Sequence, residues 1–438
     1  MPKYVRHISE WAELDAMLPP DKIIVDKVLC GSGMTYHYLT NDMPVILASP
    51  RRALIDSKMD DDDINKNLHY FDRSDPHKVT LVESIEKLSK YLFRCRFYNL
   101  TPKILCTYDS LPSVIKCADQ SNWLDEFVLV GDEATCIFTD ARMKGSESIK
   151  LLELIDSLEN RCIFISATHL KNVYLDEVPV FKDMPYVRFE WDPSREQKVY
   201  FKRNKMTSTV GAICGIIDTY RANGGYFEAK IIDGQQVKST EAAFFLNSVD
   251  DIVKIVKKEG LTANDTRVIC ADNSENRAAL KKVGLTIGRF PAKNRYKKMY
   301  KANTFITRSS FEGADYYSDN ASIYVFADSN RETLSLDISI DLPQIIGRCR
   351  TKENPFRNEI HYYYKTTDAE RFNLQEAKAE IQAKIDRTEQ FIQENNGKVG
   401  PISMEKYKAA QEHLKYTQDY ADVICDDKGN MRLEKIRW

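Results

Sequence analysis

The sequence predicts an α/β fold built on parallel sheets and divided into more than one domain. Short apolar stretches typical of buried strands recur along the chain, and several end in glycine, hydroxyl or carboxylate residues that lead into a helical pattern. A single hydrophobic core stops growing at about 250 to 300 residues, and this chain has 438 residues. We therefore expect two or three domains.

The composition argues against a membrane protein and against a secreted disulfide framework. The ten cysteines form no C-x-x-C pair and fall largely in apolar stretches, as reduced core thiols do. No apolar run approaches the length of about 18 residues that a membrane span needs, so we expect no membrane partner and a cytoplasmic location. The chain has 63 lysines and arginines against 65 acidic residues, and affinity for nucleic acid has to come from local patches.

The first candidate site is a glycine-containing turn in residues 23–39, IIVDKVLCGSGMTYHYL. Its two glycines would let successive backbone N–H groups face a phosphate at the start of a helix, and the hydroxyl of Thr35 would ligate Mg²⁺. The usual phosphate loop ends in Gly-Lys-Ser/Thr, and here Met34 stands in place of the lysine. The alternative is an ordinary strand-to-helix turn. The candidate phosphate-binding residues are Gly31, Ser32, Gly33, Met34 and Thr35.

A pair of carboxylates forms the strongest catalytic signal. The apolar stretch 127–130 stops at Gly131 and delivers Asp132 and Glu133. Ligands of open α/β sheets bind beyond the carboxyl ends of the strands. Asp132 would hold Mg²⁺ there, and Glu133 would orient and deprotonate a water that attacks a γ-phosphate. The alternative is two exposed loop acids.

Two basic stretches are candidates for contacts with a nucleic-acid backbone. One pair of arginines follows the apolar stretch 45–48 at the start of a helical pattern, where guanidinium groups suit phosphate oxygens. Residues 289–301, RFPAKNRYKKMYK, interleave six basic residues with three aromatic ones and contain no acid, which suits a single strand. The alternative in both cases is a solvated basic surface. The candidate contacts are Arg51, Arg52, Arg295 and Lys297.

The order of these segments resembles that of a known family. The phosphate loop is followed by S-P-R-R-A-L (49–54), T-Y-D-S-L (107–111), D-E-A-T (132–135) and S-A-T (166–168), each after its own strand-like stretch. This order resembles the first RecA-like domain of the superfamily-two helicases, and the ordered set is far more specific than any one motif.

The second half of the chain contains the partner motifs. F-I-T-R-S-S-F-E-G-A-D (305–315) resembles the family's T-x-x-x-x-x-G-x-D motif through Thr307, Gly313 and Asp315. D-L-P-Q-I-I-G-R-C-R (341–350) resembles its Q-x-x-G-R motif through Gln344 and Arg348. The resemblance spans residues 20–365.

The resemblance implies two RecA-like parallel-sheet domains in tandem with a C-terminal helical extension. The expected boundaries are 1–190 for an ATP-binding domain, 191–365 for a second helicase domain and 366–438 for a helical hairpin. Residues 186–195 would be the linker that crosses between the domains and acts as their hinge.

The resemblance also implies an ATP- and Mg²⁺-dependent helicase or translocase on single-stranded or forked DNA, with RNA as the alternative substrate. The T-Y-D-S-L and G-R-C-R segments lean towards the origin-binding replication type of phages and mobile elements, and the C-terminal helices would dock a replication partner. By residue, the implied roles are catalysis for Glu133, Gln344, Arg348 and Arg350, nucleotide binding for Gly313 and Asp315, and nucleic-acid contact for Thr107, Thr307 and Arg308.

Two questions stay open at this level. The family's finger motif has a second arginine three residues after the first, whereas here Thr351 takes that place and Arg350 comes one residue early. Either Arg348 or Arg350 would be the finger. The missing loop lysine leaves a choice between a working ATPase, in which Lys27 or Arg51 substitutes for the lysine, and a helicase-shaped scaffold that binds nucleic acid or a partner without turnover.

Overall fold

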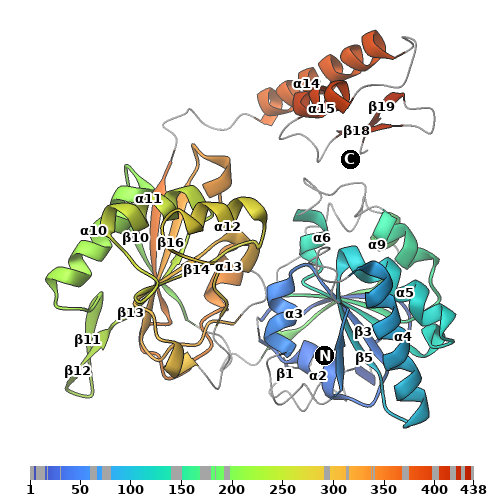
Figure 1. Cartoon of the computed structure of the whole chain (residues 1–438), viewed down its shortest axis with the longest axis horizontal. Helices are drawn as coiled ribbons and strands as arrows, with labels where there is room; N and C mark the ends of the chain where they lie inside the picture. The colour runs from blue at the N-terminus through green and yellow to red at the C-terminus, as the bar shows by residue number, and fades with distance from the viewer. Residues whose placement is uncertain are drawn as a thin grey trace.

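The computed structural model describes residues 4–5, 15–16, 18–29, 31–59, 67–71, 80–139, 150–167, 179–182, 184–191, 198–290, 296–311, 315–336, 338, 341–366, 374–396, 404–414, 421–425 and 430–435. Figure 1 shows two sheets side by side, each flanked by helices, and a smaller C-terminal group of helices and a hairpin. Among the candidate site residues, Gly313 and Arg295 lie outside the described residues.

The first sheet has seven strands in the order β4-β5-β3-β6-β7-β2-β8, and every pairing is parallel. Its inner strands are apolar along most of their length because both faces of the sheet are covered. The strands are β2 (Ile23–Asp26), β3 (Val45–Ser49), β4 (Leu68–Tyr70), β5 (Lys103–Thr107), β6 (Val128–Asp132), β7 (Cys162–Ser166) and β8 (Tyr186–Arg188). Strand β1 (Tyr4–Val5) pairs separately with β9 (Glu190–Trp191).

The second sheet has six parallel strands in the order β10-β17-β16-β13-β15-β14. An antiparallel hairpin of β11 (Glu228–Ile232) and β12 (Gln235–Ser239) precedes β13. The sheet strands are β10 (Tyr200–Lys205), β13 (Glu241–Phe245), β14 (Thr266–Ile269), β15 (Asn303–Ile306), β16 (Ala321–Asp328) and β17 (Glu359–Lys365).

Helices connect the strands and cover the sheets. The longest of them in the first domain begins with a capping box, in which Thr80 accepts from the N–H of Glu83 and the Glu83 carboxylate accepts from the N–H of Thr80. The first-domain helices are α2 (Met34–Thr40), α3 (Arg52–Met59), α4 (Leu81–Phe97), η2 (Tyr108–Ser110), α5 (Leu111–Gln120), η3 (Leu124–Glu126), α6 (Thr135–Thr139) and α9 (Pro179–Lys182). Those of the second domain are α10 (Thr209–Ala222), α11 (Val249–Glu259), α12 (Ser274–Lys281), η5 (Tyr296–Met299), η6 (Arg308–Ser310), η7 (Glu332–Leu334) and α13 (Asp341–Ile346).

The C-terminal tail holds two helices and a β-hairpin. Helices α14 (Leu374–Asn395) and α15 (Met404–His413) are followed by the antiparallel strands β18 (Ala421–Cys425) and β19 (Met431–Lys435). Ile385 and Ile392 of α14 are buried against residues of α15 and the hairpin, in a cluster of the tail's own. None of the helices in the described part of the chain is both long enough and apolar enough to cross a membrane.

The predicted fold class is confirmed, because two parallel sheets follow one another and lead into a C-terminal extension of two helices and a β-hairpin. The predicted crossing linker is wrong over its first residues. Residues Tyr186–Arg188 form the edge strand β8 beside β2, and the ring N–H of Trp191 donates to the carbonyl of Lys27 over 2.7 Å. These residues therefore belong to the first sheet and the loop beside it. The domain boundaries themselves stay predictions.

Candidate nucleotide site between the two sheets

The phosphate-loop segment winds tightly from β2 into α2. Gly31 and Gly33 have left-handed backbone conformations, with φ of +69° and +88°. Val28 is also left-handed, at φ +59°, although a β-branched side chain rarely adopts this conformation. The N–H of Val28 donates to Oδ1 of Asp26 over 3.0 Å, and this bond holds the turn. The strand therefore ends in a strained turn rather than in a flexible loop.

Met34, in the place of the usual lysine, lies in the core. Its side chain is 1% exposed and packs in a cluster with Ile23, Val25, Tyr38 and Leu39. A thioether suits this position because it fills irregular core space without a charge to solvate. The loop therefore presents no cation from the position at which the family motif has one.

The two carboxylates after β6 are buried, which excludes the alternative of exposed loop acids. Asp132 is 2% exposed and Glu133 is 3% exposed. Glu133 has a left-handed backbone, with φ +52°. The hydroxyl of Tyr108 donates to the carbonyl of Asp132 over 2.8 Å and fixes the end of the strand. Buried carboxylates need partners, because an unpaired buried charge is costly.

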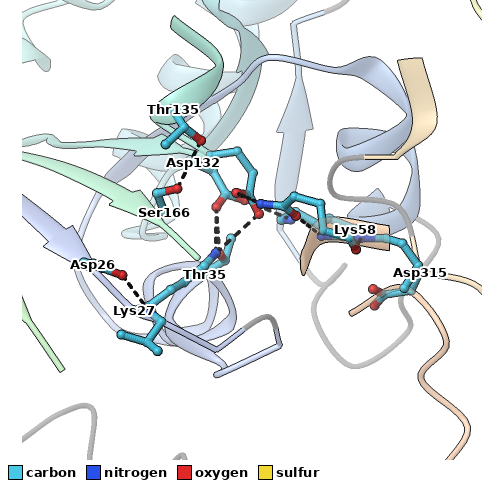
Figure 2. A network of polar contacts seen from close by, with 12 residues as sticks. Asp26, Lys27, Thr35, Lys58, Asp132, Thr135, Ser166 and Asp315 are labelled. Atoms are coloured by element: carbon cyan, nitrogen blue, oxygen red, sulfur yellow. Dashed lines mark hydrogen bonds and ion pairs between the residues drawn. The ribbon is translucent and has the colours of Figure 1, made fainter. Parts of the chain in front are cut away.

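Asp132 has three such partners in the first domain, and they point at it from three different segments (Figure 2). The ammonium of Lys27, directly after β2, lies 3.4 Å from Oδ1, and the hydroxyl of Thr35 donates to the same oxygen over 3.3 Å. The ammonium of Lys58, in the last turn of α3, lies 3.4 Å from Oδ2. Lys27 is also 3.6 Å from Oε1 of Glu133.

These contacts set the protonation of the site. Burial opposes ionisation of Asp132, but the charges of Lys27 and Lys58 outweigh it and hold the pKa of this carboxyl below its usual range. Burial lowers the pKa of Lys58, and the charge of Lys27 adds to the shift while Asp132 and Asp315 oppose it. Asp315 belongs to the second domain, so the two domains share one electrostatic environment.

The second domain reaches Glu133 through Gln344 of α13. The Gln344 amide donates to Oε2 of Glu133 over 2.9 Å, and Gln344 is 1% exposed. The guanidinium of Arg348 donates to the carbonyl of Gln344 over 2.8 Å and to its side-chain oxygen. A buried chain of contacts therefore leads from the acid of one domain to an arginine of the other.

Arg350 lies over the phosphate loop itself. Its Nε donates to Oδ1 of Asp315 over 2.6 Å. A Cβ atom added to Gly31 would lie 2.8 Å from Cζ of Arg350 and 3.2 Å from its Nη2. Glycine at position 31 is therefore favoured by its positive φ, and any side chain there would displace the guanidinium of Arg350.

The donor set suits Mg²⁺ bound together with a nucleotide. Thr35 and Asp132 offer a hydroxyl and a carboxylate oxygen 3.3 Å apart, and Mg²⁺ is held by one or two protein oxygens with phosphates and waters supplying the rest. No group of three or more His, Cys, Asp or Glu side chains that would hold a metal alone occurs among the described residues. When bound, Mg²⁺ would neutralise phosphate charge.

Most of the predicted nucleic-acid contacts have polar partners within the protein. Arg52 donates to the hydroxyl of Tyr70 over 3.3 Å, and Thr107 donates to the hydroxyl of Ser110 over 3.0 Å. The side chain of Arg308 is paired with Asp341, and Lys297 lies 3.2 Å from Asp319. Thr307 is 4% exposed, and its hydroxyl bonds to the carbonyl of Ile269 and to Ser309. Arg51 is half-buried before α3.

Sequence reasoning missed Lys58, and it named Lys27 only as a guess. Neither belongs to a motif. Lys58 lies in a helix with no unusual pattern, and its distance from Asp132 along the chain, 74 residues, gives no sign of the contact. Only the parallel order of β2, β3 and β6 brings the segments that carry these lysines to the end of β6.

No protein-family model and no curated protein matches the chain. Among solved structures, the DEAD-box helicase Mss116 bound to single-stranded RNA is similar over 94% of this chain and 84% of its own, with 10% identity and a TM-score of 0.51. Dbp5 of S. cerevisiae bound to RNA is similar over 80% of both chains, with 11% identity and a TM-score of 0.48. The helicase Lhr of Mycobacterium smegmatis is similar over 98% of this chain, with 11% identity and a TM-score of 0.45, and the chain spans 58% of the Lhr length. The likeness to Mss116 shows the fold of this chain, which is two RecA-like α/β domains in tandem.

Proposed function

We propose that the protein is an ATP-dependent nucleic-acid helicase or translocase that binds the triphosphate between its two domains. The observation that carries the proposal is the hydrogen bond from Gln344 of the second domain to Glu133 of the first, with Arg348 bound to the same glutamine. Phosphoryl transfer in such motors needs an acid that handles the water and a cation that stabilises the charge on the transferred group. Here these two groups come from separate domains.

In the proposed reaction Glu133 is the general base. Its carboxylate orients a water for in-line attack on the γ-phosphate and accepts the proton. Gln344 holds one carboxylate oxygen of Glu133 and so sets the direction of the other. Arg350, which lies against Gly31 of the phosphate loop, is placed to stabilise the charge on the phosphoryl group. This favours Arg350 over Arg348 as the finger.

The contact between Gln344 and Glu133 would also couple chemistry to movement. It joins two domains, so the domains cannot separate without breaking it. A nucleotide that favours the closed arrangement and a product that does not would open and close the pair in each cycle. That movement is what a translocase transmits to the bound strand.

Single-stranded or forked DNA is the proposed substrate, in the replication of a phage or mobile element. The T-Y-D-S-L and G-R-C-R segments support this assignment by resemblance only. Arg51, Arg52 and Lys297 are the proposed contacts with the phosphate backbone. The C-terminal tail, which has a core of its own, is the proposed docking element for a replication partner.

The proposal is tested by steady-state ATP hydrolysis with single-stranded DNA, forked DNA and single-stranded RNA. We expect at least one of them to stimulate hydrolysis, and we expect Glu133→Gln to lower the stimulated rate by about 10² or more, because a general base contributes 10² to 10⁴. Nucleotide binding should survive in this variant. Glu126→Gln is the matched control, since Glu126 is a half-exposed acid of the same domain that pairs with Arg96. The absence of stimulation by all three polynucleotides would reject the motor, and stimulation by RNA alone would reject the DNA assignment.

One observation favours a second function. Because Met34 is buried at the lysine position, a protein that binds nucleic acid on a helicase scaffold without turnover is the alternative. It predicts no hydrolysis in the wild type and equal DNA binding by the wild type and Glu133→Gln, with or without nucleotide.

A further inference from the structure

The phosphate loop lacks its usual lysine, yet two other lysines lie beside Asp132 at the end of β6. Lys27 and Lys58 come from different segments, and each lies 3.4 Å from a different oxygen of Asp132 (Figure 2). Thr35, the loop residue next to Met34, donates to one of these oxygens. Two cations therefore lie beside the loop threonine, where a triphosphate held by the loop would place its terminal phosphates.

We propose that Lys27 and Lys58 together bind the terminal phosphates of the nucleotide in place of the missing loop lysine. This inference rests on the proposed function and identifies which residues make the unusual loop work. The loop lysine of the common motif reaches the β- and γ-phosphates as a point charge. Here the charge comes from the residue that follows β2 and from the end of α3.

Lys27 is held firmly enough for this role. Its N–H donates to the carbonyl of Ser166 over 2.8 Å, and its carbonyl accepts from the ring N–H of Trp191 over 2.7 Å. Both backbone groups of Lys27 are thus tied to neighbouring strands of the first domain. The side chain, which is 7% exposed, extends towards the two carboxylates. Such positioning of a binding group by its backbone reduces the entropy lost on binding.

Lys58 reaches Asp132 from helix α3 and is also influenced by the second domain. Its side chain is 15% exposed at the end of α3, and Asp315 acts on its charge together with Asp132. Asp315 in turn holds Arg350, which lies on Gly31. The lysine therefore lies between the buried acid of the first domain and the arginine of the second.

The ion pairs of Lys27 and Lys58 with Asp132 are longer than a strong charge-assisted hydrogen bond. A charge-assisted N–H···O bond is about 2.7 to 2.9 Å long, whereas the contacts of Lys27 and Lys58 with Asp132 are 3.4 Å. Lysine has a flexible four-carbon stem and an ammonium with three donors. Both ammonium groups can therefore leave Asp132 for phosphate oxygens, and the Asp132 carboxylate, next to Thr35, is then left for the divalent cation.

The competing interpretation is that the two lysines only neutralise buried acids. It differs in one measurable respect. Removing a lysine that contacts the γ-phosphate weakens the binding of a triphosphate more than that of a diphosphate. Removing a lysine that is only a counter-ion of Asp132 weakens the binding of both nucleotides equally, or of neither.

The test compares Mg²⁺-dependent binding of AMP-PNP and ADP by calorimetry in the wild type, Lys27→Met and Lys58→Met. We expect each variant to bind AMP-PNP about 10- to 100-fold more weakly, since a hydrogen bond to a charged group is worth that factor, and to bind ADP with a clearly smaller loss. Lys103→Met is the matched control. Lys103 is a lysine of the same domain at the start of β5, and it is 4% exposed. Its ammonium donates to the backbone carbonyls of Tyr38 and Met43 and to the side-chain oxygen of Asn41. Its loss should lower stability and leave the ratio of the two affinities unchanged.

The outcomes separate this inference from the proposed function. If the wild type binds AMP-PNP and both variants bind it equally well, the inference is overturned and the function stands. Equal losses for AMP-PNP and ADP also overturn it, in favour of counter-ions. A wild type that binds neither nucleotide rejects both. Should Lys27→Met fail to fold, Lys58→Met decides, because its side chain is the more exposed of the two.

Discussion

Asp132 of the first domain and Glu241 of the second are buried carboxylates whose pKa values are shifted in opposite directions. In the first domain Asp132 lies between two ammonium groups, and their charges keep its pKa below the usual range despite burial. In the second domain Glu241, at the start of β13, is also largely buried. There burial outweighs the hydrogen bonds from Ser318 and Tyr316 and the charge of Arg267, and it raises the pKa of Glu241 to about 7.

The positively charged residues of the two domains also differ, in type and in the length of their ion pairs. The first domain contributes lysines at 3.4 Å, and the second contributes Arg350, bound to Asp315 at 2.6 Å and packed on a glycine of the other domain. Lysine is a mobile point charge and arginine a rigid fork. The comparison teaches that Asp132 is paired with mobile lysine charges at the longer distance, whereas the Arg350 guanidinium is fixed by a shorter ion pair and by its packing on Gly31.

The largest expected effect tests the rigid fork. Arg350→Lys keeps the charge and loses the fork, and we expect hydrolysis to fall by about 10³, the lower end of the range for an arginine finger. Unfolding should change much less than hydrolysis, because lysine keeps a positive charge beside Asp315. Single-turnover hydrolysis and urea unfolding measure the two. Arg221→Lys is the control, since Arg221 forms an ion pair of the same 2.6 Å length with Glu259 on α10 and α11. A full rate in Arg350→Lys would assign the finger to Arg348.

The next effect tests the bridge between the domains. Gln344→Ala removes the amide that contacts Glu133 and Arg348. We expect the rate of hydrolysis to fall by about 10- to 100-fold, because both of these buried groups lose a hydrogen-bond partner. If Gln344 acts through Glu133, adding Gln344→Ala to Glu133→Gln should cost little more. Additive losses in this double-mutant cycle would show that the two residues act independently.

A third prediction concerns how the free energy of unfolding depends on pH through Glu241. The pKa of Glu241 is raised in the folded state, so its contribution to stability is complete below the unfolded value of 4.5 and is lost as the pH rises through about 7. The free energy of unfolding should fall by about 1 to 3 kcal/mol over this interval, and Glu241→Gln should remove the fall. Urea unfolding between pH 5 and pH 8 of the wild type and the variant measures it. A wild-type curve that is no steeper than that of Glu241→Gln would contradict the assignment.

The smallest effect tests the packing of Arg350 on the loop. Gly31→Ala places a side chain at φ +69° and against Arg350, whereas Gly224→Ala does so at φ +78° with nothing within 4 Å. Each should lose about 1 to 2 kcal/mol of stability from the backbone alone. Only Gly31→Ala should also slow hydrolysis, because only there must the guanidinium move. Equal activity in the two variants would place Arg350 elsewhere during turnover.

Much of the site follows from local pattern. The apolar strand before Asp132 and Glu133, and the glycine turn before Thr35, indicate strand ends on one edge of a parallel sheet, and the structure brings these residues together. The linker prediction failed over its first residues, 186–191, for a physical reason. A short edge strand such as β8 has partly exposed residues and carries no apolar run to distinguish it from a loop.

By itself the sequence determined the fold class and the order of the strand-end motifs, because periodicity and turn residues act over a few neighbours in the chain. Only the tertiary structure decided that Met34 faces the core, that Lys27 and Lys58 share Asp132, and that Arg308 is taken up by Asp341. Each of these depends on groups brought together by sheet order and domain contact. Charge and burial at such points are set by the surroundings of a residue, which its sequence neighbours do not specify.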